Sequence, residues 1–147
     1  MVPTSAIFAH LRGVLQRSYI MQDLTLKQLD QLVMALKAAR FFKGYEIIRQ
    51  GAPGEDFYLI ATGRVSVWVD KGKGRVKKAE LRADDFFGEM ALISNGPRNA
   101  TVVAEGQVEV FVLQKSDFEK ILLKNPAIAE KLKKAYEARA AENRSQA

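Results

Sequence analysis

Glu89 and Arg98 are the two charged residues of this chain whose surroundings suggest chemistry. They lie in the segment FFGEMALISNGPRNATVV, residues 86–103, where Glu89 follows Gly88 and Arg98 follows Pro97. Both charges stand among apolar residues, an arrangement that a solvated surface loop does not require. The simpler interpretation is an ion pair between them that closes the loop. The alternative is a binding site for a charged ligand.

A phosphate would suit such a site. Residues 89–93 are predicted to form a single helical turn after Gly88, and the first N–H groups of such a turn attract an anion. Gly88 would let the backbone approach the ligand closely, and Arg98 would neutralise the phosphate with two parallel hydrogen bonds. Glu89 would repel a phosphate, so it is better suited to accept from a sugar hydroxyl. The pattern therefore predicts a ribose phosphate with a free hydroxyl, and an apolar or stacking surface elsewhere for a purine.

The elements that would position these residues begin with helices. Residues 5–39 have helical periodicity, broken by a connector near residues 18–23, so an early helix is expected at 5–17 and a second one after it. Thr25 and Gln28 have the spacing of a capping box at the start of the second helix. We assign residues 1–40 to the N-terminal helices.

From residue 41 the apolar period changes to two. Short segments rich in β-branched and aromatic residues are separated by glycines, and strands are predicted at 65–69, 79–81, 100–104 and 108–113. Many short strands at this spacing favour a small antiparallel barrel or roll. The chain is therefore predicted to have an α+β fold, with a β-roll at 41–115 that contains the segment 86–101.

Helices return at residues 116–147. Ser116 and Glu119 form a second predicted capping box, and a last helix is expected to begin near Pro126. Arg139 extends the apolar stripe of that helix and could cap a purine by a cation–π contact. Tyr136 could stack on the base instead, and the third alternative is that Arg139 only marks the solvated end of the helix.

Composition narrows the class of protein. The 147 residues suit one domain, and they include no cysteine and no apolar run near the ~20 residues of a membrane span. No secretory signal is recognised, so a cytoplasmic location is expected, either free or on the cytoplasmic side of a membrane protein. The net charge of +6 favours anionic partners. The basic run at 71–78, KGKGRVKK, is interpreted as a solvated hairpin tip, with a phosphate-contacting patch as the alternative.

The segment FFGEMALISNGPRNATVV closely resembles the phosphate-binding cassette of cyclic nucleotide-binding domains. These domains occur in regulatory subunits of protein kinase A, in cyclic nucleotide-gated channels and in the bacterial catabolite activator. The family pattern F-G-E-x-A-L, a short spacer and P-R-x-A-T is matched by residues 87–92 and 97–101. The stretch IIRQGAPGEDFYLIATGRVSV also resembles the early roll strands of the family, and the resemblance extends from about residue 20 to about residue 140.

The resemblance implies a role for each matched residue. Arg98 would pair with the exocyclic oxygens of a cyclic phosphate, and Glu89 would accept from the ribose 2′-hydroxyl. Main-chain N–H groups of the cassette would complete the cradle. The expected ligand-binding residues of the cassette are Gly88, Glu89, Met90, Ala91, Arg98, Asn99 and Ala100. Strand alternation, and not the resemblance, suggests Val67, Ala79 and Leu81 as a roll wall beneath the base, and the stripe of the last helix suggests Arg139 above it.

The same resemblance leaves the base less well defined. In the family, alanine after the arginine often accompanies cAMP, and threonine or serine favours cGMP. Asn99 matches neither. We favour cAMP, because the hydroxyl associated with guanine is absent.

We therefore expect a regulatory domain that binds cAMP or cGMP, needs no cofactor or metal, and moves its last helix in response. Its effector would be a kinase, a channel or another partner in cis or in trans, and the helix at 5–17 is a candidate linker or dimer contact. Direct insertion into a membrane is not expected.

Three other functions are compatible with parts of the pattern. The first is the sensory module of a DNA-binding regulator, which would need a helix-turn-helix after the last helix, where only about twenty residues follow Pro126 in this sequence; no nucleic acid partner is expected. The second is a degenerate roll that binds no nucleotide. The third is an enzyme, which is disfavoured because the chain has one isolated histidine, no cysteine and no P-loop.

Overall fold

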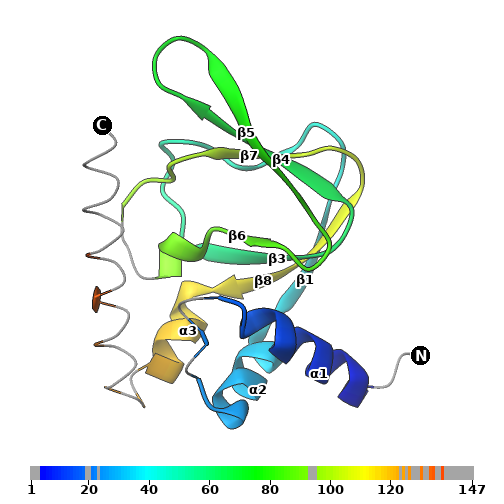
Figure 1. Cartoon of the computed structure of the whole chain (residues 1–147), viewed down its shortest axis with the longest axis vertical. Coiled ribbons are helices and arrows are strands. Elements are labelled where there is room, and N and C mark those ends of the chain that lie inside the picture. The colour runs from blue at the N-terminus through cyan, green and yellow to red at the C-terminus, as the bar shows by residue number, and fades with distance from the viewer. Residues whose placement is uncertain are drawn as a thin grey trace. The chain divides into compact units, whose positions relative to one another are not determined.

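The computed structural model describes residues 4–18, 21–22, 24–92 and 96–122, together with positions 124, 126, 130, 133, 134 and 137. The chain forms two compact units. One is helical and consists of Met1–Ala35 with Ser116–Ala147, and the other is the β-roll of Leu36–Lys115. Both units are drawn in Figure 1. The change from helix to strand and back therefore coincides with a change of compact unit.

The helical unit contains α1 (Thr4–Leu15), α2 (Leu26–Ala35) and, from the boundary residue onward, α3 (Lys115–Leu122). Helices α1 and α2 lie against each other and are joined by an ion pair between Arg12 and Asp30, whose closest N and O atoms are 3.2 Å apart. The buried side chains of these two helices recur at helical spacing: Leu11, Val14 and Leu15 in α1, and Leu29, Leu32 and Val33 in α2. Among the described residues, no helix is long and apolar enough to cross a membrane.

The predicted capping box at the start of α2 is confirmed. The backbone N–H of Gln28 donates to Thr25 Oγ1 at 3.1 Å, and the backbone N–H of Thr25 donates to Gln28 Oε1 at 2.9 Å. Each side chain thereby satisfies a backbone donor that has no partner within the helix. This reciprocal pair fixes the residue at which α2 begins.

Replacing Thr25 with alanine should therefore lower the free energy of unfolding by about 0.5–2 kcal/mol. The physical reason is that the N–H of Gln28 loses its acceptor at the helix start. Urea denaturation followed by circular dichroism measures the change. Gln28→Glu is the matched control, since it keeps a side-chain acceptor for Thr25 and should cost far less. Equal losses in the two variants would contradict this account of the helix start.

The roll consists of two four-stranded antiparallel sheets, which confirms the predicted α+β fold (Figure 1). One sheet has the order β1-β8-β3-β6, with bounds Lys37–Phe41, Val108–Gln114, Asp56–Thr62 and Phe86–Phe87. The other has the order β2-β7-β4-β5, with bounds Glu46–Ile48, Thr101–Ala104, Arg64–Asp70 and Arg75–Arg82. The roll is built around one hydrophobic cluster: Ile48, Ile60, Val65, Phe87, Val102, Ala104, Val108 and Val110.

One local prediction was wrong. The N-terminal helical pattern was extended to residue 39, but α2 ends at Ala35 and residues 37–41 form β1. This strand is imposed by pairing with β8, in which Lys37 lies opposite Val112 and Phe41 opposite Val108. The pairing of β4 with β5 contains a register shift between Val67 and Trp68, because Lys78 of β5 is an extra residue without a partner, whereas β4 pairs with β7 in regular register.

Candidate functional site: a half-buried arginine beside a glycine turn

The predicted helical turn after Gly88 is present. Gly88 follows β6 and has φ of 79°, a left-handed conformation that favours glycine. The 3-10 helix η1 (Glu89–Leu92) comes next, and the N–H of Ala91 donates to the Gly88 carbonyl oxygen at 3.1 Å. Ala91 and Leu92 are both buried, so their side chains fix the turn against the roll. The Ala91 N–H, one of the amides expected to cradle a ligand, is thus used in closing the turn.

The guanidinium of Arg98 lies in a narrow space against the backbone of Gly54, Asp56 and Gly88, which we call the seat of Arg98. Its Nη2 donates to the main-chain oxygen of Asp56 at 2.7 Å. A Cβ atom placed on Gly54 would lie 2.0 Å from Arg98 Nε, and one placed on Gly88 would lie 3.1 Å from Arg98 Nη1. Side-chain carbon at either glycine would therefore intrude on the guanidinium. The two glycines leave the space in which Arg98 lies.

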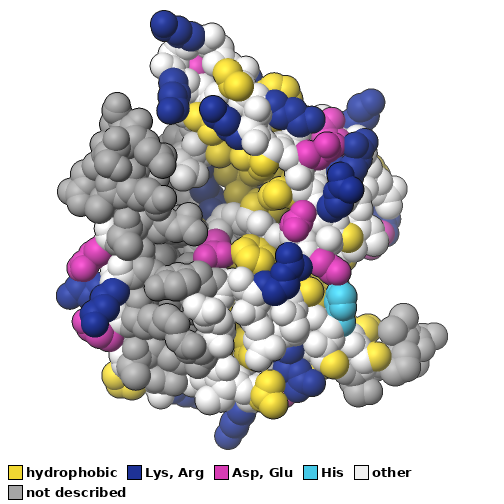
Figure 2. Space-filling model, in the orientation of Figure 1, with side chains coloured by type: hydrophobic (Ala, Val, Ile, Leu, Met, Phe, Trp, Pro, Cys, Tyr) yellow, Lys and Arg dark blue, Asp and Glu magenta, His cyan; other side chains and the backbone are white. Residues whose placement is uncertain are grey.

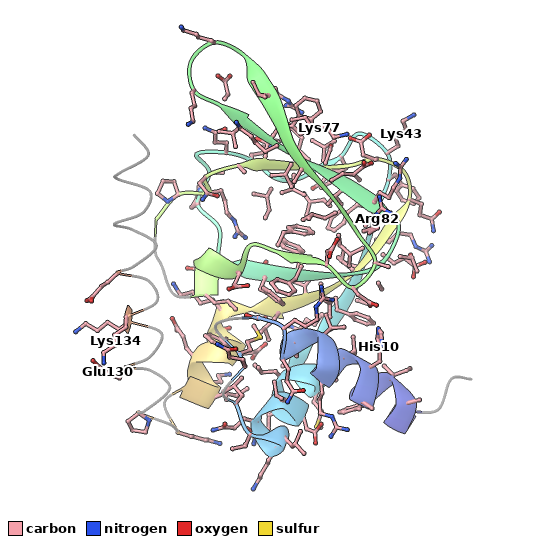
Figure 3. The ribbon with its side chains drawn as sticks, viewed as in Figure 1. His10, Lys43, Lys77, Arg82, Glu130 and Lys134 are labelled. Atoms are coloured by element: carbon pink, nitrogen blue, oxygen red, sulfur yellow. The ribbon has the colours of Figure 1, made fainter. Side chains whose placement is uncertain are left out.

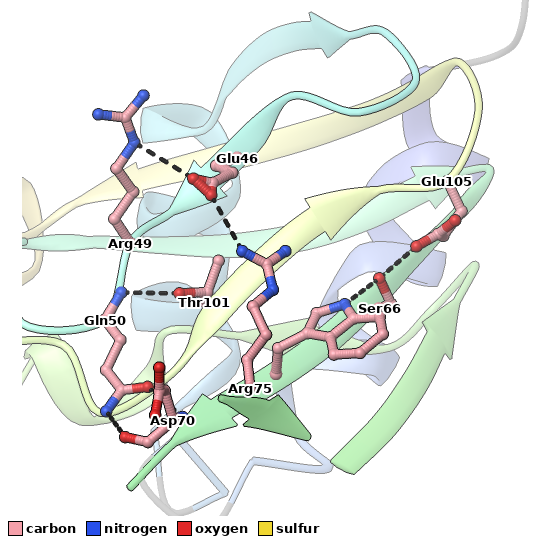
Figure 4. A network of polar contacts seen from close by, with 9 residues as sticks. Glu46, Arg49, Gln50, Ser66, Asp70, Arg75, Thr101 and Glu105 are labelled. Atoms are coloured by element: carbon pink, nitrogen blue, oxygen red, sulfur yellow. Dashed lines mark hydrogen bonds and ion pairs between the residues drawn. The ribbon is translucent and has the colours of Figure 1, made fainter. Parts of the chain in front are cut away.

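The backbone of Arg98 is held as firmly as its side chain. The N–H of Gly51 donates to the Arg98 carbonyl oxygen at 2.7 Å, and the N–H of Arg98 donates to the Ala52 carbonyl oxygen at 2.9 Å. The adjoining Gln50 N–H donates to Thr101 Oγ1 at 3.0 Å, a contact drawn in Figure 4. Segments far apart in the sequence thus hold the main chain of Arg98 in place through hydrogen bonds that involve no ligand.

The electrostatic surroundings of Arg98 are unusual for a cation. Burial lowers the pKa of the guanidinium, and the nearby Tyr58 and Asp56 oppose that effect. Burial also raises the pKa of the Tyr58 hydroxyl. The ion pairs found in the described part of the chain lie elsewhere, and none of them includes Arg98. A half-buried positive charge is therefore held by a carbonyl oxygen, an arrangement that leaves it suited to an incoming anion.

The carboxyl group of Asp56 makes the stability of the folded state depend on pH. Burial raises the pKa of its carboxyl above the ordinary value, although the Arg98 charge partly offsets this. The folded state therefore holds the Asp56 proton more tightly than the unfolded chain does. The contribution of this group to stability is largest at acid pH and declines as the pH rises through the raised pKa.

Asp56→Asn should abolish that decline. Its free energy of unfolding, relative to wild type, should increase between acid and neutral pH, because only the wild-type carboxyl must ionise in a partly buried place. Urea unfolding at a series of pH values measures the difference. A difference between the two proteins that stays constant with pH, or that changes in the opposite direction, would contradict the assignment.

The other predicted site residues have varied surroundings. Asn99 is exposed and Ala100 is half-buried. Val67 and Leu81 pack against the hydrophobic cluster of the roll, whereas Ala79, which lies opposite Val67 in β5, is exposed. Met90 belongs to η1. Tyr136 and Arg139, the candidate lid residues, lie outside the described residues.

The sequence interpretation missed three residues that shape this site. They are Gly54, which gives space to the guanidinium, Asp56, whose main-chain oxygen accepts from it, and Tyr58, whose ring stacks on Phe87 with centroids 4.9 Å apart. The signal was available in the glycine- and proline-containing stretch GAPGED before β3. A turn of this kind lets two stretches of backbone approach closely.

Comparison with known proteins identifies the family. The model of the family described as "Cyclic nucleotide-binding domain" matches residues 39–125. The chain belongs to this family. The match covers the whole cassette and most of the roll, and it starts later and ends earlier than the resemblance seen in the sequence.

Relatives and solved structures agree with this assignment. A cAMP-dependent protein kinase regulatory subunit of Colletotrichum orbiculare is 37% identical, with 70% of this chain and 26% of the relative covered. A cGMP-dependent protein kinase of Toxoplasma gondii is 33% identical, with 83% of this chain and 12% of the relative covered. The chain thus spans only a minor part of these relatives. The regulatory domain of Toxoplasma gondii PKA, crystallised with cAMP, has the same fold: the TM-score is 0.71 at 24% identity, covering 94% of this chain and 51% of that one.

Proposed function

We propose that this cyclic nucleotide-binding domain binds cAMP in preference to cGMP, and that Arg98 and Glu89 are the residues that recognise the phosphate and the ribose. The proposal depends above all on the seat of Arg98. A guanidinium that has lost part of its hydration and donates to a neutral carbonyl gains most from a ligand carrying a negative charge. The cyclic phosphate of the nucleotide supplies that charge.

The remaining parts of the nucleotide have candidate surfaces on the roll. Glu89 begins η1, directly after Gly88, where its carboxylate would accept from the ribose 2′-hydroxyl. Figure 2 shows hydrophobic side chains lining a hollow below the β4–β5 hairpin. Val67 and Leu81 are half-buried at the edge of the roll core and are proposed to lie beneath the purine, with the exposed Ala79 beside them.

Calorimetric titration with cAMP, cGMP and 5′-AMP tests ligand identity. We expect cAMP to bind most tightly and cGMP less tightly. We expect 5′-AMP to bind most weakly, because its phosphate is not joined to both the 3′ and 5′ oxygens of the ribose as it is in a cyclic nucleotide. Asn99→Thr supplies the hydroxyl that the resemblance associates with guanine, so it should shift the preference toward cGMP. Tighter binding of cGMP by the wild-type chain would overturn the base assignment. Absence of binding to either cyclic nucleotide would overturn the function.

We also propose that ligand binding repositions the C-terminal helical segment. If this segment contacts both the ligand and the roll, the ligand binds more tightly to the conformation in which those contacts are made. Adding ligand then increases the population of that conformation. The cation or ring that would cover the base is Arg139 or Tyr136. A kinase in cis or in trans is the proposed effector, because the relatives named above are a kinase regulatory subunit and a cyclic nucleotide-dependent kinase.

The chain contains no cysteine, so spin labels can be placed without background. Lys43→Cys and Lys134→Cys put one label on the roll and one near the C-terminus, both at exposed positions. Pulsed electron paramagnetic resonance should give a distance distribution that shifts when cAMP is added. An unchanged distribution at saturating cAMP would refute the coupling while leaving the binding proposal intact.

A further inference from the structure

The β4–β5 hairpin carries a dense positive charge that the nucleotide site does not use. Its connecting segment and the start of β5 contain four lysines, Lys71, Lys73, Lys77 and Lys78, together with Arg75. No acidic residue occurs between positions 71 and 79. Gly72 and Gly74 have φ of 100° and 88°, values that allow the tight reversal at the tip. Figure 2 shows Lys and Arg side chains gathered over this end of the roll, and Figure 3 places Lys77 on the hairpin.

The acidic residues nearest in sequence and in the sheet are already engaged. Asp70 Oδ1 accepts from the Gly72 N–H at 2.7 Å, and Glu80 pairs with Arg64 at 2.7 Å. Glu46 pairs with Arg75, at 3.5 Å. The ion pairs of the described residues include none of the four lysines, all of which are exposed. Their charge is therefore available to a partner.

The hairpin is anchored, so it presents these lysines in a defined place. The side-chain amide of Gln50 donates to the Asp70 carbonyl oxygen and accepts from the Asp70 N–H, both at 2.8 Å (Figure 4). Arg75 lies over the Trp68 ring at 5.3 Å from its centroid. Beyond these anchors, β5 is an edge strand of its sheet, and the ribbon in Figure 1 shows the hairpin extending past β7.

The chemistry of the patch distinguishes between anionic partners. Lysine carries a hydrated point charge on a flexible stem and is depleted in specific protein interfaces, where arginine and aromatic residues are enriched. Arg75, the arginine next to the tip of the hairpin, is paired with Glu46 and lies over the ring of Trp68, so neither Arg75 nor that ring is free for a partner. Single-stranded nucleic acid would require exposed rings for stacking. The exposed apolar side chain at the tip is Val76, which is 56% accessible.

We propose that the β4–β5 hairpin is a docking surface for the anionic headgroups of a lipid bilayer. Clusters of four or more basic residues bind phosphatidylserine-type surfaces through diffuse attraction that needs no stereospecific fit. A projecting hairpin can reach a flat surface without burying the rest of the roll. The attachment is peripheral, reversible and sensitive to salt, and its four lysines are not among the proposed nucleotide contacts.

Co-sedimentation of the full chain with phosphatidylcholine vesicles, with and without phosphatidylserine, tests the proposal. The wild-type chain should bind only the anionic vesicles, more weakly at higher salt. Replacing Lys71, Lys73, Lys77 and Lys78 with glutamine should reduce the partition coefficient by about fivefold per lysine. The matched control replaces four exposed lysines elsewhere, Lys27, Lys43, Lys120 and Lys124, with glutamine and should retain most of the binding.

Each outcome is decisive. Equal losses in the two quadruple variants would show that net charge alone is responsible and would overturn the hairpin assignment. Failure of wild type to bind anionic vesicles at low salt would overturn it as well. Binding of the hairpin to duplex DNA or polyglutamate but not to vesicles would replace the lipid with another partner. Calorimetry of the hairpin variant with cAMP should be unchanged, which keeps this test separate from that of the nucleotide site.

Discussion

Arg98→Gln is expected to weaken cAMP binding by ~2–4 kcal/mol, about 30- to 900-fold, without destabilising the folded domain. The loss follows from removing the charge that would neutralise the cyclic phosphate. Stability should be retained because burial disfavours the guanidinium charge. Glutamine keeps much of the side-chain volume and an amide that can donate to the Asp56 carbonyl oxygen.

Two measurements separate binding from folding in this variant. Calorimetry gives the affinity for cAMP, and thermal denaturation without ligand gives the stability. Arg82→Gln is the matched control: it removes the same charge from an exposed position of β5 and should leave affinity within about twofold. An Arg98→Gln protein that binds cAMP as wild type does would remove the basis of the proposed function. A weakened affinity that merely parallels unfolding would do the same.

A stable but inactive variant would also explain why Arg98 is half-buried. Residues positioned for binding often cost stability in the free protein, since the site is complementary to a ligand that is absent. The guanidinium of Arg98 donates to a carbonyl oxygen rather than to a carboxylate, and burial removes part of its hydration. If Arg98→Gln raises the free energy of unfolding, the charge of Arg98 destabilises the free protein. That result is expected when a cation is positioned to bind an anionic ligand.

Local patterns in the sequence predicted the features that depend on neighbouring residues. The capping box of Thr25 and Gln28 needs only two residues at the right spacing, and its two hydrogen bonds are present. The turn after Gly88 likewise follows from one flexible residue and a short helical segment. These predictions needed no knowledge of what the rest of the chain does.

Features that depend on distant segments could not be predicted in the same way. The residues of β1, KAARF, suit a helix by intrinsic propensity, and only pairing with β8 makes them a strand. The extra residue Lys78 makes a bulge in β5 where that strand pairs with Val67 and Trp68 of β4, and its position is visible only once the two strands are paired. In the site, the motif located Arg98, but the space that Arg98 occupies is set by Gly54, which comes before β3.

Gly54 therefore carries the second large expected effect: Gly54→Ala should reduce cAMP affinity nearly as much as the loss of Arg98 does. The new Cβ would lie 2.0 Å from Arg98 Nε, 2.7 Å from Cζ and 2.9 Å from Cδ, all atoms of one flexible side chain. Because Gly54 does not have a positive φ, alanine fits its backbone. The chain should fold, with Arg98 displaced from the Asp56 carbonyl oxygen and the phosphate site lost.

Gly88→Ala provides the contrast. There the added Cβ would lie 2.8 Å from the main-chain oxygen of Asp56, and φ of 79° is strained for alanine. Neither the backbone oxygen nor the turn can move aside as a side chain can. Gly88→Ala should therefore lose stability as well as affinity, whereas Gly54→Ala should lose affinity alone. Thermal denaturation of the two variants without ligand makes this comparison.

A double-mutant cycle decides whether Gly54 acts through Arg98. If Gly54 only positions the guanidinium, Gly54→Ala should have almost no further effect on cAMP binding in an Arg98→Gln background, so the two losses will not add. Additive losses would mean that Gly54 contributes to the site by a separate route. Gly54→Ala with unchanged affinity would show that the arginine can bind phosphate from another rotamer, and the narrow seat would then have no role in recognition.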